Sequence, residues 1–111
     1  MKKYQYLLAG TALGFALSVS LPAHASGNYE AGKAKSTTCA GCHGADGVST
    51  VPSFPKLAGQ NSDYLYHALK DYKAGKRKNP IMAGQVEALS DTDMHDLATF
   101  FSKQQGLYLK Y

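Results

Sequence analysis

Both cysteines of the chain, and a histidine directly after the second one, lie in the sequence Cys39-Ala40-Gly41-Cys42-His43. Two thiols at this spacing can each add across one vinyl group of haem. The imidazole beside the second thiol is then carried under the ring, where one nitrogen can bind the iron. Cys-x-x-Cys-His is for this reason the attachment pattern of c-type haem. We therefore expect one haem c (iron), bound covalently through Cys39 and Cys42, with His43 as an iron ligand.

Three other interpretations of the cysteine pair compete with haem attachment. A redox-active site of the thioredoxin type requires a strand–helix–strand context, which the flanking sequence does not offer. A structural zinc site requires four ligands, and besides His43 and the N-terminal His24 only His67 and His95 remain. A disulfide that closes so short a loop would add little stability. The histidine after the second cysteine favours haem.

A second iron ligand has to come from elsewhere in the chain, and the candidates are Met82, Met94, His67 and His95. Met94 lies on the apolar stripe of a predicted helix, and both histidines lie in predicted helices beside such a stripe. Met82 lies in residues 79–89, which we expect to be a loop that can present it to the opposite face of the haem. Its thioether is a soft ligand that suits ferrous iron. We predict Met82, with a histidine or an open sixth position as alternatives.

The elements that must position these residues are three predicted helices, at about residues 28–38, 62–74 and 90–105. Glycine and proline punctuate the loops between them, at 44–60 and 79–89, and no alternating strand pattern is present. We therefore predict an all-α fold.

Two of these helices carry terminal signals. Ser62 is the expected N-cap of the second helix, which ends before Gly75. Ser90 with Asp93 three residues later is an acidic version of the capping box, and Gly106 is expected to end the third helix.

The first 25 residues have the layout of a secretory signal peptide. Lys2 and Lys3 precede an apolar, uncharged run from Tyr6 to Leu21, and Ala23-His24-Ala25 supplies a small-x-small site. This predicts cleavage after Ala25 and export to the periplasm. An uncleaved membrane anchor is the alternative, but the run is shorter than the ~20 residues that span a bilayer.

Removal of residues 1–25 leaves 26–111, predicted to be one mono-haem domain, and the loss of two lysines lowers the formal net charge from +4 to +2. A small, near-neutral exported domain is a poor candidate for nucleic acid binding, and we expect no stable membrane insertion after cleavage. A domain of this size buries only about 60% of its unfolded surface. Covalent haem would supply the missing core.

One dense basic cluster lies at the C-terminal end of the second predicted helix and directly after it. It consists of Lys70, Lys73, Lys76, Arg77 and Lys78. The cluster is either a docking patch for acidic partners or a solvated helix end that the helix dipole favours. The sequence leaves both open.

Beyond the haem motif, three further stretches make the chain resemble the bacterial class I cytochromes c. The resemblance is strongest to one half of the periplasmic di-haem members (cytochrome c4/c553-like). The matching stretches are residues 38–44, 54–60, 75–84 and 89–93. The stretches come in the expected order, and the resemblance extends over nearly the whole predicted mature chain. Those relatives carry a second Cys-x-x-Cys-His motif, which is absent here, so we expect a single-haem form. Residues 106–111 have no role that the resemblance assigns.

The resemblance implies a small fold of three main helices, with loops wrapped around one haem, and roles for individual residues. It places Pro55 where a backbone carbonyl accepts the second ring N–H of the haem histidine. Leu57 falls where an apolar side chain covers the haem, and Met82 where the family has its axial methionine. Gly32 falls where the first helix crosses the last, opposite Phe100 or Phe101.

An iron bound by both His43 and Met82 has no open position for substrate, which suits electron transfer. We see no acid, base or nucleophile placed for catalysis, and expect a carrier and not an enzyme. We hypothesise a monomer that shuttles electrons between periplasmic redox partners, such as a cytochrome complex and a terminal oxidase or reductase. Two alternatives stay open. One is a haem subunit of a larger dehydrogenase or oxidase, and the other is a haem enzyme or gas sensor with a displaceable ligand.

Overall fold

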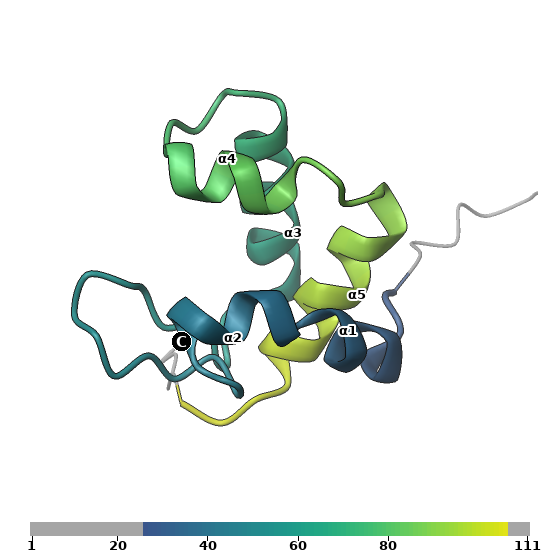
Figure 1. The fold of residues 1–111 in the computed structure, drawn as a ribbon. Coiled ribbons are helices and arrows are strands. Elements are labelled where there is room, and N and C mark those ends of the chain that lie inside the picture. Colours follow the sequence, from purple (N-terminus) through teal and green to yellow (C-terminus); the bar gives the residue numbers. More distant parts are fainter. Residues whose placement is uncertain (1–25, 107–111) are drawn as a thin grey trace, which may run out of the picture.

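A computed structural model describes residues 26–106 and confirms the all-α prediction. The described residues form five helices (Figure 1): α1 (Tyr29–Lys35), α2 (Thr37–His43), α3 (Ser62–Lys73), α4 (Pro80–Val86) and α5 (Asp91–Ser102). Within 26–106, none of the helices is long and apolar enough to cross a membrane. The predicted signal peptide, 1–25, and tail residues 107–111 lie outside the described residues.

The first predicted helix is in fact two helices, which meet at Ser36. The hydroxyl group of Ser36 donates to the carbonyl oxygen of Lys33 over 2.8 Å. Such local side-chain bonds compete with the regular helix pattern. The break lets α2 start in a new direction and carry the cysteine motif away from α1 (Figure 1).

The prediction of a loop over residues 79–89 is wrong, because Pro80–Val86 form α4. The side chain of Asn79 caps this helix and Pro80 occupies its first turn. Asparagine at the N-cap and proline at the first helical position are both strong helix-start signals. Met82 therefore lies on a short helix and not in a loop.

The other predicted helix ends need smaller corrections. The N-cap of α3 is Asn61, whose side chain accepts bonds from Asp63 N and Tyr64 N, and not Ser62. The capping box of Ser90 and Asp93 is present at the start of α5. That helix ends at Ser102, before the predicted stop at Gly106.

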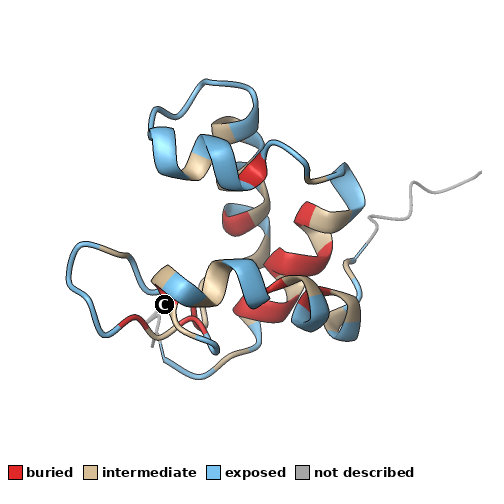
Figure 2. Cartoon of the chain, viewed as in Figure 1, coloured by how far each residue is buried: buried red, intermediate tan, exposed pale blue. Residues whose placement is uncertain are grey.

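Helix α5 is the centre of the core, and α1 and α3 pack against it (Figure 2). Its buried residues Leu97, Phe100 and Phe101 cluster with Leu65 of α3. The predicted close crossing at Gly32 is present. A Cβ atom at Gly32 would lie 2.0 Å from the carbonyl oxygen of Asp96 and 2.9 Å from Phe100 Cβ. Only glycine allows α1 and α5 to approach this closely.

A buried carboxylate joins the same two helices. Asp96, with 3% of its surface exposed, accepts bonds from Asn28 N and Lys35 Nζ, both over 2.7 Å. Lys35 Nζ also lies 2.9 Å from Asp93. The bond from Lys35 lowers the pKa of Asp96. Bonds from Ser90 and then Lys35 lower the pKa of Asp93 to about 2.

The long loop between α2 and α3 is closed by one hydrogen bond within it and tied to the core by another. The carbonyl oxygen of Gly47 accepts a bond from Leu57 N over 2.8 Å, and Gly59 N donates to Phe101 O over 3.0 Å. Gly47 has a φ of +78°, which a residue with a side chain rarely adopts. These contacts fix the position of residues 54–57.

Candidate functional site

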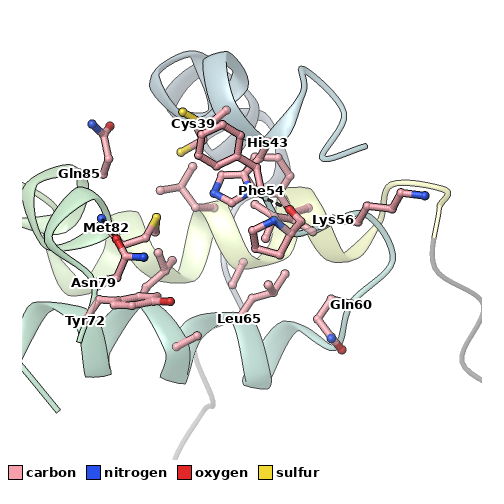
Figure 3. Close-up of a pocket in the computed structure, with 18 of the residues that line it drawn as sticks. Cys39, His43, Phe54, Lys56, Gln60, Leu65, Tyr72, Asn79, Met82 and Gln85 are labelled. Carbon is pink, nitrogen blue, oxygen red and sulfur yellow. Dashed lines mark hydrogen bonds between the residues drawn. The ribbon is translucent and has the colours of Figure 1, made fainter. Parts of the chain in front are cut away.

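An apolar cleft of about 490 Å³ opens between α2, α3, α4 and the 44–60 loop, with α5 at its base (Figure 3). This volume is within the range of small-molecule and cofactor sites. All six predicted site residues line it: Cys39, Cys42, His43, Pro55, Leu57 and Met82. The structure thus brings together residues from three separate parts of the sequence.

His43 is the last residue of α2, and its side chain is buried. Its Nδ1 atom lies 2.8 Å from the carbonyl oxygen of Pro55, so the predicted hydrogen bond is present. A carbonyl oxygen only accepts, so Nδ1 carries the proton and donates. The Nε2 atom is then left with its lone pair, as a metal ligand requires.

Cys39 and Cys42 lie on α2 beside His43, half-buried and with free thiols. Neither takes part in a disulfide. Burial raises the pKa of Cys39, which favours its neutral form. Two thiols on the wall of an apolar cleft fit attachment to a large apolar group.

Met82 extends from α4 into the cleft, and its sulfur faces the side on which His43 lies (Figure 3). The other ligand candidates lie elsewhere. Met94 is buried in the core, while His67 and His95 line a separate hollow between α3 and α5. The ring of His95 stacks on Tyr66 with centroids 3.7 Å apart. Of the four candidates, Met82 alone lines the cleft.

Sequence reasoning missed several cleft residues, above all Arg77. Its guanidinium carbon lies 5.0 Å from the centroid of the Tyr72 ring, and Nη1 donates to Tyr64 Oη over 3.3 Å. The bond with Tyr64 raises the pKa of Arg77, so the group stays charged. In the sequence, Arg77 cannot be distinguished from the neighbouring lysines of the basic cluster. Tyr64 lies in the first turn of α3 and Tyr72 in the last, and four-residue steps place both on one side of the helix.

The rest of the basic cluster is partly engaged in contacts within the chain. Lys70 Nζ lies 3.9 Å from Asp91 and 5.1 Å from the centroid of the Tyr66 ring. Lys73 donates to the carbonyl oxygen of Leu89. These bonds link α3 to the start of α5, so part of the cluster has a structural role.

These residues fit a haem group. One wall of the cleft carries two thiols and an imidazole with a fixed tautomer, and the opposite wall carries a thioether. The chain matches the family model for cytochrome c over residues 29–105. It belongs to the cytochrome c family. Membership identifies a c-type haem protein, and electron transfer is the activity of this class.

Known cytochromes c support the assignment over most of the chain. Cytochrome c4 of Stutzerimonas stutzeri is 46% identical over 99 residues, which are 81% of this chain and 47% of that protein. Cytochrome c-554(548) of Halomonas halodenitrificans is 39% identical over 83 residues, 72% of this chain and 100% of that protein. The crystal structure of reduced recombinant cytochrome c4 from Pseudomonas stutzeri matches with a TM-score of 0.70 and 46% identity, covering 73% of this chain and 47% of that one.

This chain spans about half the length of the cytochromes c4 that it matches. The structural match is to a class I cytochrome c fold, as the resemblance implied. In this family the two cysteines of the motif bind haem c covalently, and here they are Cys39 and Cys42. The predicted haem attachment is thereby confirmed.

Proposed function

We propose that this protein is a periplasmic carrier of single electrons, with one haem c whose iron is bound by His43 and Met82. One observation carries the proposal. The imidazole of His43, with its tautomer set by Pro55, and the thioether of Met82 line the same cleft from opposite sides (Figure 3). When bound, the haem supplies an iron centre that changes oxidation state by one electron.

Two strong protein ligands would leave the iron with no position for a substrate. This disfavours bond-making chemistry and supports a carrier that is not an enzyme. Leu57 lines the cleft and packs against the core, and it would cover the haem and exclude water. Exclusion of water lowers the local dielectric constant, which is one means of tuning a haem potential.

Arg77 would supply positive charge to the haem carboxylates. It lines the cleft, and the ring of Tyr72 and the hydroxyl group of Tyr64 hold it in place. A guanidinium group is well suited to pair with carboxylates.

Residues 1–25 are proposed to direct export and to be removed after Ala25, which leaves a single haem domain. The proposed partners are other periplasmic redox proteins, such as a cytochrome complex and a terminal oxidase or reductase. Lys76 and Lys78 are exposed near the cleft residues Arg77 and Asn79. They would attract an acidic partner through long-range, salt-dependent forces.

The test is a redox titration of the exported, haem-loaded protein and its Met82→Ala variant. Both should carry covalent haem. The variant should have a lower potential, because loss of the thioether removes the ligand that favours ferrous iron, and it should bind carbon monoxide when reduced. Met94→Leu removes a buried methionine outside the cleft and should leave both properties unchanged. A Met82→Ala protein with the parent's spectrum and potential would disprove the ligation. Cell fractionation tests the periplasmic location.

A further inference from the structure

Helix α4 carries Met82 but is weakly anchored to the rest of the protein. Val86, at its last turn, is its one buried residue. Ile81, beside Met82, has 56% of its surface exposed, and Gly84 lowers the helix propensity of the interior. A helix of seven residues is unstable in isolation. The stability of α4 therefore depends on the few interactions at its two ends.

Burial of Val86 anchors the C-terminal end of α4, and Asn79 caps the N-terminal end. The side-chain oxygen of Asn79 accepts a bond from Ile81 N over 3.0 Å and from Met82 N over 3.1 Å. The second bond ends on the backbone of the proposed ligand itself. Asn79 also lines the cleft, and its side chain lies beside that of Met82 (Figure 3).

Pro80 strengthens this arrangement. It keeps the preceding residue extended, and Asn79 has φ −158° and ψ 116°. Pro80 itself occupies the first turn of the helix, where its fixed φ is preorganised. Asn79 and Pro80 thus fix the residue at which α4 starts. They thereby fix the point at which the Met82 side chain enters the cleft.

We propose that Asn79 is a positioning residue for Met82, and that its cap controls how often the thioether leaves the iron. This inference depends on the proposed His43 and Met82 ligation. Weakly anchored segments open locally without unfolding of the whole protein. Loss of an asparagine cap of ordinary strength would raise the population of the open segment about five-fold.

The experiment measures the binding of imidazole, a competing iron ligand, to the oxidised, haem-loaded protein. Asn79→Ala should bind imidazole about five-fold more tightly than the parent. Asn79→Ser keeps a cap oxygen and should be close to the parent. Asn79→Gly, a substitution that costs little at an N-cap, should lie between them. If the alanine variant loads haem poorly, the order of the parent, Asn79→Ser and Asn79→Gly still tests the proposal.

Asn28→Ala is the matched control. Asn28 caps α1, also a seven-residue helix, by accepting a bond from Ala31 N over 2.9 Å, and it does not line the cleft. This variant should unfold at a lower temperature and bind imidazole as the parent does. If Asn28→Ala raises imidazole affinity as much as Asn79→Ala does, the effect is a general loosening and the inference fails.

Met82→Ala separates this inference from the proposed function. It should bind imidazole much more tightly than any Asn79 variant, because no thioether competes. If it binds imidazole no better than the parent does, the ligation by Met82 is wrong. If it binds tightly while Asn79→Ala equals the parent, the ligation stands and the role of Asn79 is wrong.

Discussion

The Nδ1 atom of His43 lies 2.8 Å from the carbonyl oxygen of Pro55. His43 ends helix α2, whereas Pro55 lies in the long loop that hydrogen bonds to Gly47 and Phe101 hold in place. The bond presents Nε2 to the cleft, and it makes the imidazole a more basic ligand. The position of Pro55 in the loop therefore determines how well the imidazole of His43 can bind iron.

Pro55→Ala should loosen this hydrogen bond while keeping the carbonyl group. The proline ring restricts the opened chain, so its removal should lower the free energy of opening of this loop by about 0.4–1 kcal/mol. The Nδ1 proton should then exchange with solvent roughly two- to fivefold faster. A less basic imidazole stabilises ferric iron less, so the potential should rise. NMR exchange and redox titration measure the two effects. An unchanged exchange rate together with an unchanged potential would contradict the prediction.

Gly32→Ala should destabilise the fold by at least about 1–3 kcal/mol. The new Cβ atom would lie 2.0 Å from the carbonyl oxygen of Asp96, so α1 and α5 would have to move apart. Gly84→Ala is the control, since a Cβ atom there meets nothing within 4 Å. This second change should be neutral or stabilising, because alanine favours a helix over glycine. Guanidinium unfolding compares them, and equal stabilities would refute the close crossing.

The haem motif and helices α3 and α5 could be predicted because each carries its own local signal. Cys39, Cys42 and His43 lie within five residues of sequence, so their joint chemistry needs no knowledge of the fold. The capping box at Ser90 and the apolar stripes act over one or two turns. The contacts of Pro55 and Gly32 are long-range, and only the family resemblance located them.

Helix α4, the role of Arg77 and the break at Ser36 could not be predicted, because the local sequence there allows more than one interpretation. Pro80 and Gly84 favour a loop by residue type, although proline after an asparagine also starts a helix. Arg77 resembles its lysine neighbours in the sequence, because charge alone does not reveal that Tyr64 and Tyr72 hold it in the cleft. Ser36 divides the first predicted helix through a local bond whose strength the sequence does not indicate.

The Asp96 carboxylate should make the protein acid-sensitive. The pKa values of Asp93 and Asp96 are lowered in the folded state, so their stabilisation is present above the unfolded pKa of 3.8 and is lost as the pH falls. For Asp93 the loss extends from about pH 4 to about pH 2. Unfolding free energies measured across this range should decrease towards acid.

Asp96→Asn isolates the buried member of this pair of carboxylates. At pH 7 it should cost about 1–3 kcal/mol, because Lys35 loses a charged, buried partner. The difference from the parent should shrink as the pH falls, because the parent carboxylate is then protonated and loses its charge as well. Asp63→Asn, on the exposed start of α3, should have a much smaller effect. A difference that stays constant from pH 7 to pH 2 would show that the charge of Asp96 is not what stabilises the helix pair.

Arg77→Gln should lower the redox potential on the order of tens of millivolts, where 59 mV is a tenfold change in a one-electron equilibrium. A positive charge beside the haem disfavours the ferric state, which carries one more positive charge than the ferrous state, so removing it favours oxidation. Lys33→Gln removes the same charge from the exposed face of α1, where solvent and salt screen it, and should leave the potential nearly unchanged. Arg77→Lys keeps the charge but loses the planar contact with Tyr72, and should fall between the parent and Arg77→Gln. If Arg77→Gln and Lys33→Gln shift the potential equally, Arg77 acts only through net charge and does not face the haem.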